Sequence, residues 1–335
     1  MRVCGAEPDV QRKILVVFHP HVGTKRHSVA WRADDNNNLR KHPATDAGNH
    51  HHHHHHQQQQ HASRFRGQRN KMEPPRILHW AVPRSLSTAL LRSIMTSDDI
   101  EVKFEPFVSP YYFGEERISR RYDEDEEVVG DPSKKQSTFV GVKNFLEGEM
   151  NETSKAVFVK DMAYAVVQRG DYDELLPEGY VHTFQIRHPA RAIASMHKAS
   201  TDIAHTGWDH FDESEVGYKE LSMLFDHVTK ELGQEAIVID SEDLVRNPES
   251  ILQQYCKLTG LTYVDTMLDW SDCPVDESVF GAWLPWVTGV LKSTRFHPPS
   301  GRKDFDVASL PEPIQACIED CMPYYNNLHA KRIRP

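Results

Sequence analysis

The chain has 335 residues, 39% of them hydrophobic, and a formal net charge of −10 at pH 7 with histidines counted as neutral. That length accommodates one large domain or two smaller ones. The negative charge excludes a surface that is basic throughout, so we expect no nucleic-acid partner and only a local cluster of cations at any anion site. No run of about 18 apolar residues occurs, and we therefore expect no membrane-spanning segment and no membrane partner.

The cysteines and the N-terminal residues indicate the cellular compartment in which the protein is expected. The cysteines are Cys4, Cys256, Cys273, Cys317 and Cys321. Few, scattered and odd in number, they are typical of free thiols in a reducing compartment. The apolar patch Ile14–Phe18 is shorter than a usual signal-peptide core and has no clear cleavage site. We therefore predict a soluble, cytoplasmic protein.

Residues 1–73 differ in composition from the rest of the chain. They contain a histidine run at residues 50–56 and a glutamine run at residues 57–60. Polar tracts of this kind bury too little apolar surface to offset the entropy lost on ordering. We predict a disordered, low-complexity N-terminal region over residues 1–73 and a folded domain over residues 74–335.

Strand-like and helix-like segments alternate from Pro74 onward. The predicted strands are Ile77–Val82, Glu101–Phe104, Ala156–Val159, Val181–Ile186 and Ala236–Ile239. The predicted helices are Ser87–Ser97, Pro189–Ala199, Tyr218–Leu232 and Pro248–Thr259. Because strands that alternate with helices pair in parallel, we predict a three-layer α/β fold with a central parallel sheet flanked by helices. Ligands of such folds bind at the carboxyl ends of the strands, here after Val82, Val159, Ile186 and Ile239.

The first predicted strand runs into Pro83-Arg84-Ser85-Leu86-Ser87-Thr88, called here the anion loop, where the first helix begins. Backbone N–H groups and the helix dipole favour an anion at a helix start, and this loop adds a guanidinium and three hydroxyls. These features predict a phosphate or sulfate site, against the alternative that the hydroxyls only cap the helix. A P-loop nucleotide kinase is a weaker alternative, because the loop lacks both glycines and the lysine of G-x-x-x-x-G-K-[ST].

A second basic motif, Arg187-His188-Pro189, follows the fourth predicted strand, and Ser195 lies two turns into the next helix. An arginine at a strand end beside a helix start is suited to a second phosphate. Taken alone, the motif is equally consistent with a structural salt bridge.

Together with the segment Asp240–Pro248, the two motifs resemble the sulfotransferase family that uses 3′-phosphoadenosine 5′-phosphosulfate (PAPS). The resemblance covers about residues 76–265 and implies a P-loop NTPase-like fold. It implies that Arg84, Ser85, Ser87 and Thr88 bind the 5′-phosphosulfate, and that Arg187 and Ser195 bind the 3′-phosphate. It also implies that Asp240–Pro248 is structural and packs a strand against the following helix.

The chain departs from the family pattern at three places. Many members have glycine where this chain has Leu86, and cytosolic members have lysine where it has Arg84. Many members also cover the nucleotide with a late Arg-Lys-Gly loop. Here Gly301-Arg302-Lys303 is a partial match, and Lys292-Ser293-Thr294 is the alternative.

The resemblance implies in-line transfer of a sulfuryl group from PAPS to a hydroxyl or amine of a small-molecule acceptor. The acceptor must lose a proton, and Glu105, just after the second predicted strand, is the predicted base. In some branches of the family a glutamate at this place has that role, whereas cytosolic branches use histidine. His79 and His182 are the alternatives here, but both lie inside predicted strands and are expected in the core.

Arg84 and Lys160 are predicted to stabilise the transferring sulfuryl group. For Lys160, which follows the third predicted strand, an ion pair with Asp161 is an equal alternative. A sulfuryl group carries less negative charge than a phosphoryl group, so cations and N–H groups suffice and no metal is expected.

The acceptor is the least determined part of the reaction. Candidate aromatic residues for its pocket are Trp208, Trp270, Trp283, Trp286, Tyr111, Tyr112 and Phe113, with a place in the core as the alternative for each. The residues do not distinguish an alcohol from an amine, and they leave the oligomeric state open. A catalytically idle nucleotide-binding module on the same scaffold is the alternative function.

Overall fold

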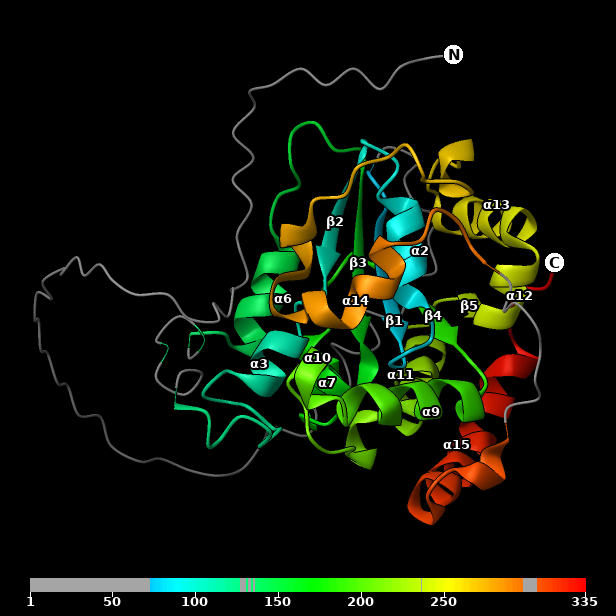
Figure 1. Cartoon of the computed structure of the whole chain (residues 1–335). Helices are drawn as coiled ribbons and strands as arrows, with labels where there is room; N and C mark the ends of the chain where they lie inside the picture. Colours follow the sequence, from blue (N-terminus) through cyan, green and yellow to red (C-terminus); the bar gives the residue numbers. More distant parts are fainter. Residues whose placement is uncertain (1–72, 127–130, 132–133, 135, 236, 298–305) are drawn as a thin grey trace, which may run out of the picture.

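The computed structural model describes residues 73–126, 131, 134, 136–235, 237–297 and 306–335. Its centre is a five-stranded, all-parallel sheet in the order β2-β3-β1-β4-β5 (Figure 1). The strands are β1 (Arg76–Ala81), β2 (Ile100–Phe104), β3 (Ala156–Met162), β4 (Val181–Ile186) and β5 (Ile237–Asp240). Because β1 is the central strand, the anion loop that follows it lies between the carboxyl ends of β3 and β4.

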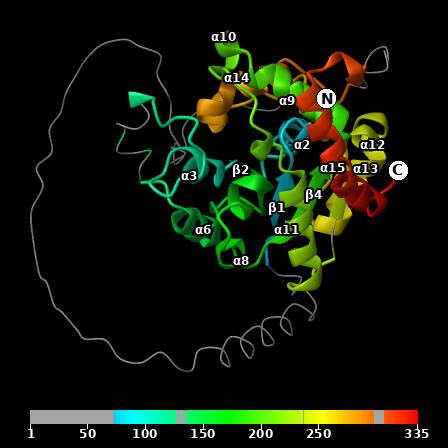
Figure 2. The ribbon, with the colours of Figure 1, turned by 90° about the horizontal axis from the view of Figure 1, so that it is seen from below.

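Helices surround this sheet. The α-helices are α2 (Ser87–Ile94), α3 (Val108–Tyr112), α6 (Phe139–Glu147), α7 (Ala163–Val167), α8 (Tyr172–Leu175), α9 (Pro189–Ser200), α10 (Ile203–Thr206), α11 (Tyr218–Lys230), α12 (Ser241–Arg246), α13 (Pro248–Thr259), α14 (Leu284–Leu291) and α15 (Glu312–Ala330). Short 3₁₀ turns are η1 (Glu213–Glu215), η2 (Asp265–Met267), η3 (Glu277–Trp283) and η4 (Val307–Ser309). Figure 2 shows α9, α10 and α14 close together near the start of α2.

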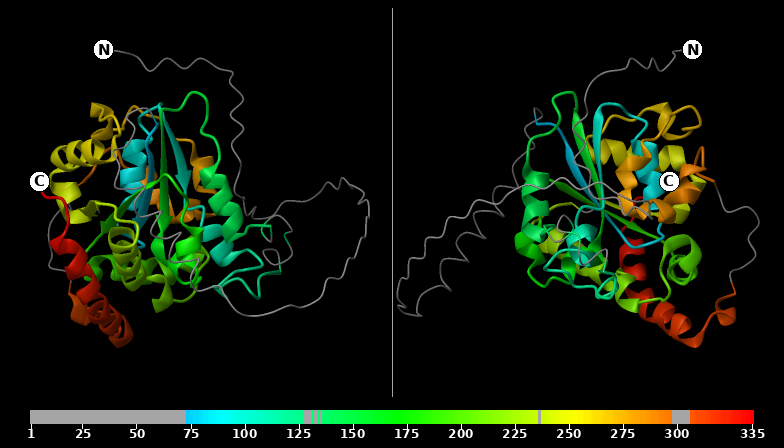
Figure 3. Two further views of the ribbon diagram at one scale, coloured as in Figure 1. Left: turned by 180° about the vertical axis from the view of Figure 1, so that it is seen from behind. Right: turned by 60° about the vertical axis from the view of Figure 1, so that its left-hand side comes forward.

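Alternate residues of the strands divide the apolar core into two layers. Leu78 and Trp80 of β1 face a cluster that includes α9, α11 and α15, whereas Ile77 faces a cluster that includes α2, α12 and α13. Phe158 of β3 belongs to the second cluster and its neighbour Val159 to the first. Helices therefore cover both faces of the sheet (Figure 3), and the predicted three-layer α/β fold with a central parallel sheet flanked by helices is confirmed.

The observed strand ends differ from the predicted ones chiefly at β3, which continues past Val159 to Met162. Lys160 and Asp161 pair in register with His79 and Trp80 of the central strand, so both lie within the sheet. The prediction that the strand ends at Val159 was wrong. The apolar run stops there, but the backbone pairing with β1 continues through the two polar residues. The helix α2 is shorter than predicted and ends at Ile94.

The two strand histidines are core residues, as expected. The ring of His79 lies between Thr183 Oγ1 at 2.8 Å and Gln185 Oε1 at 2.9 Å. The indole of Trp80 donates to Nδ1 of His182 at 2.9 Å. Burial lowers the pKa of each histidine to about 3, so both stay neutral near pH 7 and neither serves as a base in contact with solvent.

These two histidines make stability depend on pH. Their folded-state pKa of about 3 lies below the ordinary 6.5, so the unfolded chain binds protons first and stability falls as pH falls below 6.5. From about pH 7 to about pH 5 we expect urea unfolding to record a loss of about 2 kcal/mol per histidine. The variant His182→Asn keeps an acceptor for Trp80 and removes one titrating group, so it should lose about half as much.

A His182→Asn slope equal to that of the wild type would contradict the assignment.

The predicted N-terminal region, residues 1–73, lies outside the described residues except for Glu73 and stays a prediction. Within the acidic stretch that follows Tyr122, residues 123–126 are exposed. None of the helices in the described ranges has the length and apolar character required to cross a membrane.

Candidate functional site

The anion loop makes a tight turn without glycine. Arg84 and Leu86 have left-handed backbones, with φ of 60° and 65°, a conformation that costs a non-glycine residue about 1–2 kcal/mol. Between them, the carbonyl of Ser85 accepts hydrogen bonds from Gln185 Nε2 at 2.8 Å and from Ser241 Oγ. These buried contacts from β4 and α12 hold the strained turn, which explains how the loop forms without the glycines of a P-loop.

The loop leaves donors free at the start of α2. Leu86 is the N-cap residue, and its side chain makes no capping hydrogen bond. The backbone N–H groups of Ser87 and Thr88 have no acceptor among the described residues. The capping-only alternative for these hydroxyls therefore finds no support in the contacts, and the unpaired N–H groups are suited to an anion.

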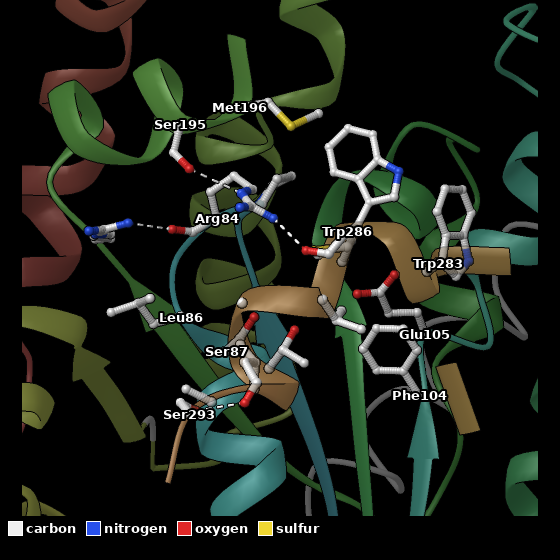
Figure 4. Close-up of a pocket in the computed structure, with 18 of the residues that line it drawn as sticks. Arg84, Leu86, Ser87, Phe104, Glu105, Ser195, Met196, Trp283, Trp286 and Ser293 are labelled. Carbon is white, nitrogen blue, oxygen red and sulfur yellow. Dashed lines mark hydrogen bonds between the residues drawn. The ribbon is translucent and has the colours of Figure 1, made fainter. Parts of the chain in front are cut away.

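The two basic motifs meet although they are about a hundred residues apart in sequence. Arg84 donates through Nε to Ser195 Oγ at 3.1 Å and through Nη1 to the Trp286 carbonyl at 2.9 Å, and its own carbonyl accepts from Arg187 Nη1 at 3.0 Å (Figure 4). Neither guanidinium pairs with a carboxylate of the described residues. Burial lowers the pKa of both Arg84 and Arg187, and the Arg187 charge lowers that of Arg84 further.

An unpaired buried donor on one of these arginines fits an anionic ligand. Arg187 Nε is buried and has no hydrogen-bond partner among the described residues. A buried polar group without a partner costs about 1–3 kcal/mol. Two guanidinium groups that form no ion pair among the described residues, with a free N–H on one of them, make a site that a phosphate or sulfate would complete.

A cavity of about 320 Å³ opens at this end of the sheet. Of the predicted donor-binding residues, Arg84, Ser87, Thr88, Arg187 and Ser195 line it, whereas Ser85 is fully buried behind the loop. The other part of the lining is mainly apolar and is formed by Phe104, Val108, Met162, Tyr164, Met196, Trp208, Trp283 and Trp286. Figure 4 shows Glu105 close to the two tryptophans Trp283 and Trp286.

Glu105 begins the turn after β2 and faces the cavity. Its backbone has φ of 49°, and its N–H donates to the Lys160 carbonyl at 2.7 Å. Its carboxylate forms an ion pair with Lys160 Nζ. Glu105 is 8% exposed and Lys160 is fully buried, so the ammonium contacts the glutamate from behind and does not line the cavity.

The alternative pair of Lys160 with Asp161 was wrong, because successive strand residues point to opposite faces of the sheet. Asp161 instead accepts N–H groups of Phe107 at 2.7 Å and Met162 at 2.8 Å. Burial raises the pKa of Asp161 to about 8 against the opposing effect of these two donors. The Phe107 contact anchors the turn that carries Glu105.

Leu86 lines the cavity, but its side chain also packs against the apolar cluster around α2. In Figure 4 it lies on the far side of Ser87 from Glu105. The leucine that replaces the family's glycine is thus accommodated largely by the core.

The late part of the chain contributes residues that sequence reasoning missed. Arg295 and His297 line the cavity, and no sequence signal marks them. The contact of Arg84 with the Trp286 carbonyl was also missed, although the Trp286 ring was a candidate. In the segment Lys292-Ser293-Thr294, Ser293 lines the cavity. The rival segment Gly301-Arg302-Lys303 lies outside the described residues.

The Asp240–Pro248 segment is structural, as the resemblance implies. Asp240 caps α12 by accepting the N–H of Glu242 at 2.8 Å, and it also accepts from Tyr325 of α15 at 3.1 Å. Ser241, in the same segment, supports the anion loop through the Ser85 carbonyl. Sequence reasoning did not single out Ser241, although its position directly after β5 could have indicated a role at this edge of the sheet.

Of the predicted aromatic residues, Trp208, Trp283 and Trp286 line the cavity. The others belong to the core and are Trp270, Tyr111, Tyr112 and Phe113.

Residues 75–332 match a family model described as Sulfotransferase domain, so the chain belongs to this family. Among curated proteins it is similar to the branched-chain-amino-acid aminotransferase-like proteins 2 and 1 of Arabidopsis thaliana. Identity to the first is 29% over 266 residues, which is 75% of this chain and 41% of that protein. Identity to the second is 27% over 271 residues, or 77% of this chain and 42% of that protein. The chain thus spans about two fifths of their length.

Sequence identity to solved structures is lower than to these curated proteins. The sulfotransferase domain from the Synechococcus PCC 7002 olefin synthase has a TM-score of 0.47 and 17% identity, covering 78% of this chain and 98% of that one. A mouse sulfotransferase complexed with PAP has a TM-score of 0.40 and 10% identity, covering 77% of this chain and 90% of that one.

Proposed function

We propose that this protein is a PAPS-dependent sulfotransferase that acts on a hydroxyl or amine of a small-molecule acceptor. Membership of the sulfotransferase domain family supports this reading. The observation that carries it furthest is the meeting of Arg84, Arg187 and Ser195 beside free N–H groups at the start of α2, with no carboxylate of the described residues paired to either arginine.

In this proposal Arg84, Ser87 and Thr88 hold the 5′-phosphosulfate, together with the N–H groups of the first turn of α2. Arg187 and Ser195 hold the 3′-phosphate. Ser85 contributes through the backbone shape of the loop, because its side chain does not line the cavity. The nucleotide supplies a sulfuryl group bonded to a phosphate leaving group. Cations and N–H groups match the charges of both, so the proposal requires no metal.

The reaction would place the acceptor between Glu105 and the anion loop. A new bond forms between the acceptor oxygen or nitrogen and sulfur, and the bond between sulfur and the bridging oxygen of the 5′-phosphate breaks. The acceptor proton passes to the Glu105 carboxylate, and Arg84 stabilises the negative charge on the leaving phosphate. Lys160, predicted to act on the sulfuryl group directly, would in this geometry act through Glu105, with which it forms an ion pair.

The apolar lining beside Glu105 supports a small organic acceptor. Cys256, Cys317 and Cys321 are free thiols, a state typical of a reducing compartment that supports the proposed cytoplasmic location.

Two measurements test the proposal. Calorimetry should detect binding of 3′,5′-ADP and little binding of ATP with Mg²⁺; the reverse preference would favour a nucleotide kinase. Transfer of radiolabelled sulfate from PAPS to a pool of neutral alcohols and amines should then yield labelled acceptor. Binding of 3′,5′-ADP with no transfer to any acceptor would favour the idle nucleotide-binding module.

A further inference from the structure

Trp208 lies in the wall of the cavity but in no regular element. It belongs to the irregular segment 207–212, between α10 and η1. The side chain is nearly buried, at 4% exposure, and its ring lies 4.5 Å from that of Trp286 and 5.6 Å from that of Tyr112. Because neither a strand ladder nor a helix holds this residue, side-chain contacts must set its position.

The strongest of these contacts comes from a buried arginine that does not line the cavity. The Arg121 guanidinium lies 3.7 Å from the centre of the Trp208 ring. It forms a two-pronged ion pair with Glu215, with Nη2 to Oε2 at 2.7 Å and Nε to Oε1 at 3.1 Å. Its Nη1 donates to the His210 carbonyl at 3.1 Å, in the same irregular segment as Trp208.

Stability alone is a poor explanation for this arrangement. The side chains of Arg121 and Glu215 are only 4% and 1% exposed, and a buried ion pair is often no more stabilising than apolar residues of similar volume. A planar guanidinium, in contrast, stacks on an indole and at the same time grips a carboxylate, which a lysine ammonium does not do. These contacts of Arg121 therefore fix the orientation of the Trp208 ring.

The polar edge of the same indole also has a partner, because Trp208 Nε1 donates to the Tyr122 hydroxyl at 2.8 Å. Tyr122 follows Arg121 directly in sequence, so one short stretch of chain holds both the face and the polar edge of the tryptophan.

We propose that Arg121 is a positioning residue that fixes Trp208 as the wall limiting the acceptor part of the cavity. This inference rests on the proposed function, because it takes the tryptophan-lined part of the cavity as the acceptor site. Loss of the stacking contact lets the indole move and weakens the fit of an aromatic acceptor, while the donor-binding residues around Arg84 stay in place.

The test compares Arg121→Lys, Trp208→Ala and the double variant with naphthol as the probe acceptor. Arg121→Lys keeps a positive charge beside Glu215, so the buried carboxylate stays paired. We expect the KM for naphthol to rise about tenfold, equivalent to about 1.4 kcal/mol. The kcat and the KM for PAPS should change less than about twofold, because neither Glu105 nor the anion loop is altered. In the Trp208→Ala background, Arg121→Lys should have no further effect.

The matched control is Arg117→Lys, which alters a more exposed ion pair, with Asp123, in the same stretch of chain; it should leave every constant unchanged. Equilibrium binding of naphthol, followed by its own fluorescence, repeats the comparison without turnover. If no acceptor is sulfated but this binding weakens as described, the proposed function fails and the positioning role stands.

Two results would overturn the inference. One is an equal effect of Arg121→Lys with and without Trp208. The other is a wild-type chain that does not bind naphthol.

Discussion

Replacing Glu105 by glutamine is expected to lower kcat by about two to four orders of magnitude, the usual contribution of a positioned general base. Affinity for 3′,5′-ADP should change less than about twofold, because the Glu105 carboxylate pairs with Lys160 and makes no hydrogen bond or ion pair with Arg84 or Arg187. Steady-state kinetics with PAPS and a responsive acceptor measure the first quantity, and calorimetry measures the second.

Because Glu105 forms an ion pair with Lys160, a second variant is needed to separate loss of the base from loss of stability. Glutamine leaves the fully buried Lys160 ammonium without a counter-charge, and breaking a buried ion pair in this way costs about 3–5 kcal/mol. The double variant Glu105→Gln with Lys160→Met removes both charges and should restore stability without restoring turnover. Recovery of stability together with continued loss of kcat separates a missing base from a misfolded chain.

The matched control is Glu101→Gln at the glutamate within β2, which pairs with Lys103 and does not line the cavity. It should retain the wild-type kcat. If Glu105→Gln also retains it, Glu105 is not the base.

Replacing Arg84 by alanine is expected to weaken the binding of 3′,5′-ADP and of PAPS by at least about thirtyfold. Hydrogen bonds from charged groups contribute about 1.5–3 kcal/mol each, and the partly buried guanidinium forms no ion pair with a carboxylate of the described residues. We also expect kcat to fall by about a hundredfold, because the same group would stabilise the charge that develops on the leaving phosphate. Calorimetry and steady-state kinetics measure the two effects.

Arg84→Lys should give an intermediate loss, since lysine keeps the charge but cannot bind Ser195, Trp286 and an anion through one planar fork. Arg246→Ala on the exposed side of α12 is the control and should behave as the wild type. Wild-type nucleotide affinity in Arg84→Ala would remove this residue from the donor site.

The anion loop shows that a turn with positive φ values can form without glycine. In a P-loop, glycine supplies the positive φ values that the turn requires. Here Arg84 and Leu86 adopt them, and the hydrogen bonds from Gln185 and Ser241 to the Ser85 carbonyl hold the turn. The strain is local, whereas the contacts that offset it come from strands and helices distant in sequence.

Much of the fold was predictable because its signals are local. The apolar period of Ile77–Val82, the hydroxyls at the start of α2 and the proline at the start of α9 each act within a few residues. The parallel sheet then follows from the alternation of strands and helices. The meeting of Arg84 with Arg187 was also predictable, since residues after neighbouring parallel strands lie at one edge of the sheet.

The amino-acid sequence by itself therefore determined the three-layer fold, the anion loop and the candidate donor-binding residues, because periodicity, helix-start chemistry and strand order are local properties of the chain. Only the tertiary structure decided that Lys160 pairs with Glu105 and not with Asp161, which of the tryptophans line the cavity, and that Arg121 stacks on Trp208. Those contacts depend on strand register and on the packing of loops far apart in sequence. Such packing is set by the whole core, and no short motif encodes it.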